Sequence, residues 1–317
     1  MLADTAAMLA ALGENVGFVL TDPANPPLAL PPGLPVLPLA AAGLTASDCF
    51  LVPEGWPNAL APGLAAGART VVYCQNWAYL DSGLPDGVRL DQLPVRYLAV
   101  SDPVAQYIER LLGVTAPVLR PAIDPARFFP PRTKPAPAPV RVAFMPRKNK
   151  ALAGMIARFA ATRAARTGLR LGFVPIDKLP PDGVAETLRS CHVFLATGFP
   201  EGCPLPPLEA LACGCLVAGF TGFGGFDYLR QIGPGGPAAS IALRDVAWGG
   251  NAFLAADHDV FGAADALERA ARLWLDSGTA LDTALANARA TAAAYHPDRR
   301  REVLAALWEL PAPSARP

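Results

Sequence analysis

The chain of 317 residues is long enough for two domains of ordinary size, and 52% of it is hydrophobic. Its 27 Lys and Arg balance 27 Asp and Glu, so it has no basic excess to neutralise phosphates, and we expect no nucleic-acid partner. No apolar run reaches the roughly 18 residues of a membrane span, no secretory leader is recognisable, and six cysteines form no C-x-x-C pair, so we expect a cytoplasmic protein with reduced thiols.

The first half of the sequence predicts strands joined by loops and helices. Asp4 is suited to cap a helix that ends at Gly13, and Asp102 starts a second helix that ends at Gly113. The proline-rich stretch Pro23–Pro38 is expected to be a loop or an extended segment. Buried strands are predicted at Val16–Asp22, Cys49–Val52, Thr70–Cys74, Tyr97–Val100 and Pro117–Leu119.

A second proline-rich stretch separates the two halves. Pro130–Pro139 reads PPRTKPAPAP, and its five prolines do not fit a helix or the interior of a sheet. We therefore interpret residues 131–139 as a linker between an N-terminal domain, residues 1–130, and a C-terminal domain, residues 140–296. A last helix is expected within residues 297–317.

The second half repeats a strand–helix pattern, which is typical of a parallel, doubly wound sheet. Strands are predicted at Val140–Met145, Leu169–Pro175, His192–Ala196 and Cys215–Phe220, and helices at Ala151–Arg166, Gly183–Ser190 and Pro206–Ala212. The predicted fold class is thus α/β, with two Rossmann-like domains and a cleft between them. Ligands of such sheets bind beyond the carboxyl ends of the strands.

The stretch from Pro200 to Cys215, PEGCPLPPLEALACGC, follows such a carboxyl end. Two of its prolines fit the first turn of a helix, and Gly214 fits the C-terminal cap. A helix start suits a phosphate, and Glu209, about one turn in, suits a vicinal diol such as a ribose. The alternative is that Glu201 and Glu209 only stabilise the start of the helix, where acidic side chains are favoured.

Glu201 and Glu209 form an E-x7-E spacing followed by ALACG, which resembles the signature of the retaining GT-B glycosyltransferases of family 4. The resemblance covers residues 140–228 well and the N-terminal half loosely. It implies that Glu209 holds the ribose of a nucleotide and that Glu201 contacts the transferred sugar. The loop residues implied in binding the sugar or the diphosphate are Cys203, Leu205 and Pro206. The family has Phe-Gly where Cys203-Pro204 stands, so the Leu205 N–H must serve, because proline has no N–H to donate.

A basic turn and a glycine loop complete the implied donor site. FMPRKNK offers three cations, Arg147, Lys148 and Lys150. The resemblance implies that an Arg and a Lys neutralise the leaving diphosphate, and the choice between Lys148 and Lys150 stays open. Gly224 and Gly225 are expected to let the backbone approach the ligand closely, and the nucleotide base is placed near Val174. The alternatives are a solvated basic turn and a plain tight turn. The expected catalytic residues are Glu201, Arg147 and Lys150.

The N-terminal half gives weaker signals. Gln75, Asn76 and Trp77 follow a predicted strand and are expected on the acceptor side, with a packed loop around a buried Trp as the alternative. Members of the family begin with a strand, a glycine-rich loop and a helix, whereas this sequence starts at the helix, so we expect a reduced N-terminal domain. The final helix resembles the element of the family that crosses back to the N-terminal domain. Its Arg299–Arg301 run predicts a solvated face or a weak basic patch toward anionic lipid.

These features predict a glycosyltransferase that moves a sugar, with retention, from a nucleoside-diphosphate donor to a glycan or lipid-linked acceptor in bacterial surface polysaccharide assembly. No cofactor besides the donor is expected, and no metal, since no histidine pair or acid cluster has metal-ligand spacing. Peripheral contact with the inner membrane is a further expectation. Two alternatives stay open: a nucleotide-sugar-binding relative without catalysis, and a nicotinamide-dependent oxidoreductase, against which the missing G-x-G-x-x-G argues.

Overall fold

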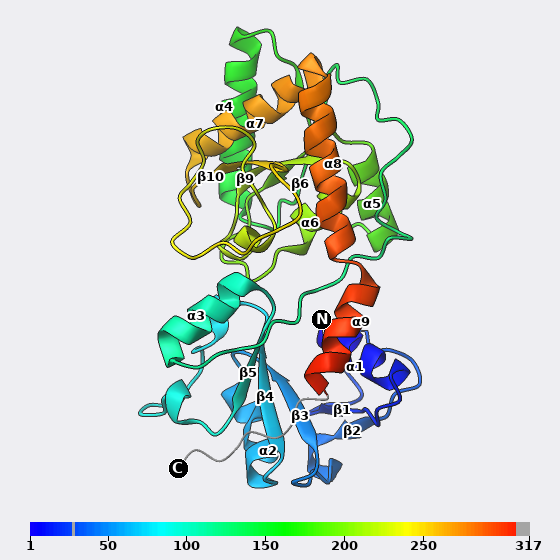
Figure 1. The fold of residues 1–317 in the computed structure, drawn as a ribbon, viewed down its shortest axis with the longest axis vertical. Helices are drawn as coiled ribbons and strands as arrows, with labels where there is room; N and C mark the ends of the chain where they lie inside the picture. The colour runs from blue at the N-terminus through cyan, green and yellow to red at the C-terminus, as the bar shows by residue number, and fades with distance from the viewer. Residues whose placement is uncertain (27–28, 309–317) are drawn as a thin grey trace. The chain divides into compact units, whose positions relative to one another are not determined.

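The computed structural model describes residues 1–26 and 29–308, and the chain divides into two compact units (Figure 1). The first unit comprises Met1–Val100, Ala105–Pro121 and the stretch from Asp298 onward, and the second comprises Ser101–Val104 and Ala122–Pro297. The stretch 131–139 therefore lies within the second unit. There Lys134 Nζ donates to the carbonyl oxygen of Leu188 at 3.0 Å and fixes the stretch to the end of a helix.

Parallel strands form the centre of the first unit. The larger sheet has the order β3 (Cys49–Pro53), β4 (Arg69–Cys74), β5 (Arg96–Ala99), and β1 (Phe18–Leu20) pairs with β2 (Val36–Pro38) in a two-stranded sheet. The helices are α1 (Leu2–Ala11), α2 (Ala61–Ala65), most of α3 (Asp102–Leu112) and α9 (Pro297–Trp308), with 3-10 turns at Leu39–Ala41, Pro57–Ala59, Trp77–Tyr79 and Leu90–Gln92. The end of β4 is the most buried part, and Tyr73 donates its hydroxyl hydrogen to the carbonyl oxygen of Leu119 at 2.6 Å.

One expectation for the first unit becomes more specific, and another is wrong. The stretch Pro23–Pro38, expected to be a loop or an extended segment, ends in β2, whose last residue pairs with Leu20. Proline is tolerated there because β2 is an edge strand, and one side of an edge strand needs no N–H donor. The expected strand Pro117–Leu119 is reduced to a bridge between Val118 and Ala99. The prolines before β2 are typical of turns, so the strand itself was not predicted. The apolar run at Pro117–Leu119 predicted a full strand where the structure has a single bridge.

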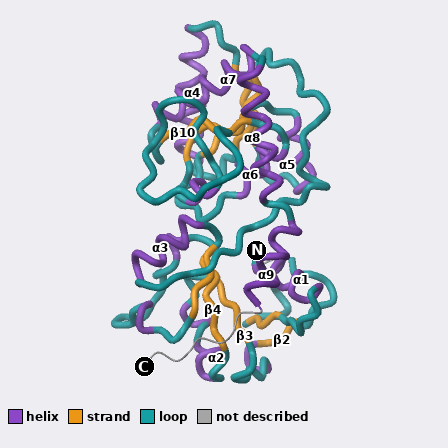
Figure 2. The backbone as a smooth tube through the Cα atoms, viewed as in Figure 1, coloured by secondary structure: helices purple, strands orange, loops and turns teal. Residues whose placement is uncertain are grey.

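The second unit contains a five-stranded parallel sheet covered by helices on both faces (Figure 2). The strand order is β10 (Ala252–Ala255), β9 (Leu216–Phe220), β8 (Val193–Ala196), β6 (Val140–Phe144), β7 (Leu171–Pro175). Helices α4 (Lys150–Arg166) and α7 (Val260–Asp276) pack together on one face, and α5 (Pro181–Arg189), α6 (Leu205–Ala212) and α8 (Thr279–Ala294) on the other, with a 3-10 turn at Gly224–Asp227. The sequence patterns gave no assignment for β10, α7 and α8.

The core of the second unit explains why its strands are almost continuously apolar. Strands covered on both faces must be hydrophobic on both sides, and all four residues of β8 are buried. Small side chains bring α7 close to the sheet, since Ala263, Ala264, Ala270 and Ala271 are fully buried there. This packing holds the carboxyl ends of the strands, and the loops that leave them, in fixed positions.

Helix α9 belongs to the first unit, although it is last in the chain. Arg300 is only 4% exposed, and its guanidinium donates to Thr5 Oγ1 at 2.6 Å and to the carbonyl oxygen of Arg120. The neighbouring arginines pair with acids of the same helix, Arg299 with Glu302 and Arg301 with Asp298, so the run carries little net charge. Across residues 1–26 and 29–308, no helix is long and apolar enough to span a membrane.

Candidate functional site

The sheet of the second unit has a topological switch point between β6 and β8. From β6 the chain passes through α4 to β7 on one side, whereas β8 lies on the other side of β6. Loops that leave two such strands diverge and open a crevice, where ligands of α/β sheets bind. Here these loops are residues 145–149 after β6 and residues 197–204 after β8.

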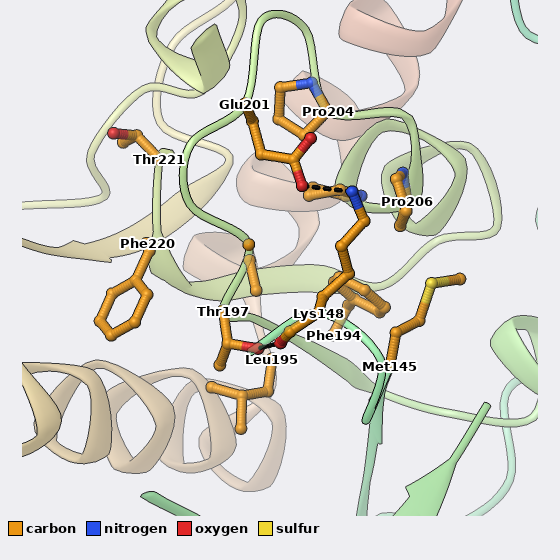
Figure 3. Close-up of a pocket in the computed structure, with 13 residues that line it drawn as sticks. Met145, Lys148, Phe194, Leu195, Thr197, Glu201, Pro204, Pro206, Phe220 and Thr221 are labelled. Atoms are coloured by element: carbon orange, nitrogen blue, oxygen red, sulfur yellow. Dashed lines mark hydrogen bonds and ion pairs between the residues drawn. The ribbon is translucent and has the colours of Figure 1, made fainter. Parts of the chain in front are cut away.

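A pocket of about 330 Å³, including its open mouth, lies at this edge of the sheet (Figure 3). Its walls come from the two loops, the end of β9 and the first turn of α6. Of the residues predicted from the sequence, Lys148, Glu201 and Pro206 line it. Phe220 and Thr221 line it as well and were not predicted. The structure thus brings together one predicted cation and one predicted carboxylate.

Lys148 and Glu201 form an ion pair in the pocket, as Figure 3 shows. The Lys148 side chain is 31% exposed and that of Glu201 is 14% exposed, so the pair is partly shielded from water. Thr197 Oγ1 donates to the Lys148 carbonyl oxygen at 2.6 Å and ties the loop after β6 to the loop after β8. Because the backbone of Lys148 is fixed, the motion left to this residue is that of its side chain.

Glu201 is held more tightly than its partner. Its backbone bridges to the glycine loop, with the Glu201 N–H donating to Gly222 O at 2.9 Å and the Gly224 N–H donating to Glu201 O at 3.0 Å. A Cβ atom at Gly198 would come within 2.3 Å of Glu201 Oε1, and one at Gly222 within 2.9 Å of Glu201 Cβ. The Glu201 carboxylate therefore sits in a space that only glycines leave open.

The glycines of this loop have a packing role within the protein. A Cβ atom at Gly224 would lie 2.1 Å from the carbonyl oxygen of Gly202, so the space is taken by the chain's own backbone. Gly225 is buried, and its Cβ would meet Leu229 Cδ1 at 3.1 Å. These glycines let two loops of the protein pack together, because the Cβ side of Gly224 is occupied by the backbone of Gly202. Their contact with a ligand stays a prediction.

Glu209 lies on α6 and is half-buried. Burial raises the pKa of Glu209 to about 7, and the charges of Arg147 and Arg127 lower it by less. Within residues 1–26 and 29–308, the Glu209 carboxylate makes no hydrogen bond or ion pair. A half-buried acceptor without a partner is costly unless something binds to it, which makes Glu209 a candidate contact for a ligand hydroxyl.

The start of α6 offers little hydrogen bonding to an anion. Pro204 is the N-cap, and Pro206 and Pro207 occupy the first turn, so three N–H groups are missing. The Leu205 N–H is left as the donor of this turn. The loop before the helix is anchored from within the second unit: Tyr228 donates its hydroxyl hydrogen to Pro204 O. Cys203, next to it, is buried, and Leu205 is half-buried.

The other predicted cations lie outside the pocket wall. Arg147 is exposed, with Nη2 3.7 Å from the sulfur of Met145. Lys150 is exposed at the first residue of α4, so of the two lysines it is Lys148 that lines the pocket. Val174 lies inside β7, paired with Ala143 of β6, and does not line the pocket. The structure places these residues on the same sheet edge or strand pair but leaves their roles as predictions.

In the first unit, Gln75, Asn76 and Trp77 follow β4 and are half-buried. A glutamate that the sequence analysis missed holds them: the Glu54 carboxylate accepts from the N–H groups of Gln75 and Asn76, both at 2.9 Å. Burial raises the pKa of Glu54, and these hydrogen bonds oppose the rise. The Trp77 ring packs against the Tyr107 ring at an interplanar angle of 50°, with ring centroids 5.3 Å apart.

A second missed carboxylate supports the glycine loop of the second unit. Asp257 follows β10 and accepts from the Gly222 N–H at 2.9 Å, and burial raises its pKa. No sequence signal was available for it, because β10 itself was not recognised. Among the residues that the structure describes, no group of three or more His, Cys, Asp or Glu side chains gathers to hold a metal ion.

Comparison with known proteins gives a partial sequence match. No protein-family model matches the sequence. Over 183 residues, the chain is 26% identical to an alpha-1,6-glucosyltransferase of Actinobacillus pleuropneumoniae serotype 7 (strain AP76), which covers 56% of this chain and 54% of that protein. The chain thus spans about half the length of this curated relative.

Solved structures resemble the chain over most of its length. Sucrose-phosphate synthase from Thermosynechococcus elongatus has a TM-score of 0.63 at 14% identity and covers 96% of this chain and 90% of its own. A glycosyltransferase from Rickettsia africae ESF-5 has a TM-score of 0.59 at 10% identity, with 96% and 92% covered. The catalytic domain of starch synthase IV from Arabidopsis thaliana, bound to ADP and acarbose, has a TM-score of 0.52 at 14% identity, with 84% and 74% covered. The predicted α/β class is confirmed, and the fold is that of the GT-B glycosyltransferases.

Proposed function

We propose that this protein is a retaining glycosyltransferase, which moves a hexose from a nucleoside-diphosphate donor to a glycan or lipid-linked acceptor. The observation that carries the proposal is the Lys148–Glu201 pair in a pocket at the switch point of the second sheet. A cation for a diphosphate and a carboxylate for sugar hydroxyls are the groups that a nucleotide sugar requires. The GT-B fold and the partial match to a glucosyltransferase support the same reading.

The proposed chemistry depends on charge at the leaving group. Departure of the nucleoside diphosphate develops negative charge on its β-phosphate, which fixed cations stabilise. We assign Lys148 to this position, with Arg147 and Lys150 as further cations on the same turn. Because these side chains neutralise the charge, the proposed mechanism routes no step through a metal ion. The Leu205 N–H, at the start of α6, adds one hydrogen-bond donor.

The ion pair between Lys148 and Glu201 suggests which of the two residues moves when the donor binds. Glu201 is fixed between glycines, whereas Lys148 has a flexible four-carbon stem, so the lysine is the group that moves. A diphosphate draws Lys148 away, and Glu201 then exchanges its ion pair for hydrogen bonds from sugar hydroxyls. A sugar-carrying nucleotide satisfies both groups, whereas a bare diphosphate satisfies only the lysine.

Glu209 is assigned to the nucleotide rather than the sugar. Its half-buried carboxylate makes no hydrogen bond to another described residue, and a ribose diol would supply two donors to it. Cys203, Leu205 and Pro206 are proposed to lie along the sugar or diphosphate, and Val174 near the base. Gln75, Asn76 and Trp77 are proposed for the acceptor. Surface polysaccharide assembly at the cytoplasmic side of a membrane is the proposed context.

Calorimetric titration with UDP, GDP, ADP, dTDP and NAD tests the donor site. We expect one nucleoside diphosphate to bind, and Glu209→Ala to weaken that binding by about 1–3 kcal/mol through loss of a charged hydrogen bond. Glu186→Ala, an exposed glutamate on α5, is the matched control and should change nothing. NMR of the product's anomeric configuration then tests retention.

Each outcome decides between the candidate functions. Binding with turnover of the nucleotide sugar supports the transferase. Binding without turnover, even with a panel of acceptors, would identify a nucleotide-sugar-binding relative instead. Binding of NAD alone, or of no nucleotide by a folded protein, would refute the proposal.

A further inference from the structure

We infer that the carboxyl edge of the β3–β4 sheet in the first unit carries a saccharide-binding surface, with Trp56 and Tyr79 as the side chains on which sugar rings stack. We call it the Trp56–Tyr79 surface, and it consists of residues 54–57 and 75–80. The inference rests on the proposed function in one respect: it takes the saccharide to be the acceptor glycan. No residue of the second unit is part of the argument.

The distribution of tryptophan and tyrosine points to this surface. The chain has 5 Trp and 6 Tyr, all within the described residues. Among these eleven, Trp56 at 67% and Tyr79 at 53% are the exposed ones. Trp77, Tyr107 and Trp308 are half-buried, and the Trp308 ring is covered by the guanidinium of Arg69 at 5.7 Å. The remaining six are buried in the core.

The two exposed aromatics lie on loops that touch each other. A Cβ atom at Gly55 would meet the carbonyl oxygen of Tyr79 at 3.1 Å, and one at Gly83 would meet Pro57 Cδ at 3.6 Å. The loop after β3 is therefore packed against the loop after β4. Trp56 and Tyr79 are on neighbouring turns, although they are 23 positions apart in the sequence.

The loops are rigid enough to present these side chains. Both oxygens of the Glu54 carboxylate are engaged by consecutive N–H groups, those of Gln75 and Asn76. Asn76 Oδ1 in turn accepts from the Ala78 N–H at 3.1 Å and caps the turn that bears Tyr79. Fixed aromatic side chains lose little conformational entropy when a ligand binds, which favours weak ligands such as neutral sugars.

The chemistry of the surface favours a saccharide over a lipid bilayer. Sugar rings have an apolar face of C–H groups that packs on an aromatic ring, and an edge of hydroxyls for which amide and carboxylate groups are partners. Residues 54–57 and 75–80 hold no Lys or Arg, and their one acid is Glu54. A surface without basic side chains offers no charge to attract anionic lipid headgroups.

A glycan array tests the inference with the full chain. We expect the wild-type protein to retain one class of neutral oligosaccharide on the array. Trp56→Ala and Tyr79→Ala should each raise the dissociation constant for that oligosaccharide roughly tenfold, because one aromatic stack is lost. Phe261→Ala is the matched control, because Phe261 is 65% exposed but lies on α7 of the second unit. Circular dichroism checks that each variant is folded.

The outcomes separate this inference from the proposed function. Glycan binding that depends on Trp56, with no binding of any nucleotide, would keep the surface and refute the transferase. Transfer with an unchanged acceptor KM in Trp56→Ala would refute the surface and keep the transferase. Retention of no glycan by the folded wild type would overturn the inference. So would Trp56-dependent sedimentation with phosphatidylglycerol vesicles, which would assign the surface to a membrane.

Discussion

Glu54 in the first unit and Glu201 in the second both follow the carboxyl end of a parallel strand, yet their carboxylates are used differently. The Glu54 carboxylate accepts two backbone N–H groups at 2.9 Å, so both oxygens are committed to the loop. The Glu201 carboxylate pairs with the side chain of Lys148, which a diphosphate can attract away. Both glutamates are half-buried. The partner's freedom to move, rather than burial, therefore separates a structural glutamate from a candidate binding one.

The largest expected effect on the rate of sugar transfer comes from removing Lys148, the partner of Glu201 whose side chain can move. Lys148→Ala should lower the rate of sugar transfer roughly 10²–10³-fold, about 3–4 kcal/mol in the barrier, because a fixed cation at the leaving group is lost. Steady-state kinetics with the donor identified by calorimetry measures this. Lys150→Ala should lower the rate less, since Lys150, a further cation on the same turn, is exposed and outside the pocket wall. An equal loss in Lys150→Ala with none in Lys148→Ala would assign the leaving-group role to Lys150.

Gly224→Ala tests whether the fixed position of Glu201 depends on the glycine loop. The new methyl group would lie 2.1 Å from the Gly202 carbonyl oxygen, so the backbone must shift and Glu201 with it. We expect a loss of about 2–3 kcal/mol in the free energy of unfolding, measured in urea. Gly154→Ala in α4, whose nearest neighbour would be the end of Arg158 at 3.4 Å, should instead stabilise by about 0.5–1 kcal/mol. Equal effects of the two variants would contradict the close packing.

Glu54→Ala tests the structural role of the Glu54 carboxylate in the first unit. Two backbone N–H groups lose a charged acceptor, so we expect a loss of about 2–3 kcal/mol in the free energy of unfolding. Glu54→Gln keeps one acceptor oxygen and should lose about half as much. Nucleotide affinity should stay within about twofold, because the pocket is built from residues of the second unit. A variant that is fully stable but binds nucleotide poorly would place Glu54 among the binding residues.

Some elements around the site could be predicted from the sequence, and others could not. The strands β6, β8 and β9 were predictable because both faces of the sheet are covered, which makes each strand an almost continuous apolar run, interrupted in β6 by Arg141. The spacing of Glu201 and Glu209 was visible because both lie within one loop and the helix that follows it. Strand β10 was missed because its four residues follow a glycine-rich loop that gives no periodic signal.

The contacts that the sequence did not reveal join partners that are distant in the sequence. Glu54 receives hydrogen bonds from residues 21 and 22 positions later, and PEG after a strand is otherwise typical of a turn. Gly224 is required because Gly202 occupies the adjacent space, a contact between two loops that no local pattern encodes. Sequence reasoning therefore located the edge of the sheet where the site lies but not the contacts that hold the site in place.

Glu201→Gln should change the affinity for two ligands by different amounts. Without the Glu201 charge, Lys148 is no longer neutralised, so a bare nucleoside diphosphate should bind more tightly, by roughly threefold to fivefold for a partly exposed pair worth about 1 kcal/mol. The nucleotide sugar should gain less, since its hydroxyls lose a charged acceptor. Calorimetry with both ligands measures the difference, and Glu186→Gln is the control. Weaker binding of the bare diphosphate would mean that Glu201 contacts the nucleotide directly and that no exchange occurs.

The smallest effect concerns Glu209, whose pKa is raised to about 7 by burial. Between the ordinary glutamate pKa near 4.5 and this value, the folded state holds a proton that the unfolded state has released. Stability due to this group is therefore present at the lower pH and is lost as pH rises through about 7, relative to Glu209→Gln. Nucleotide affinity should change in the opposite sense, because the ionised carboxylate is the stronger acceptor for a ribose. The diphosphate itself also titrates, so the measurement is the difference between wild type and Glu209→Gln across this pH range. Parallel pH profiles of affinity in the two proteins would show that Glu209 does not hold the ribose, whereas a wild-type gain of a few-fold would tie its ionisation to donor binding.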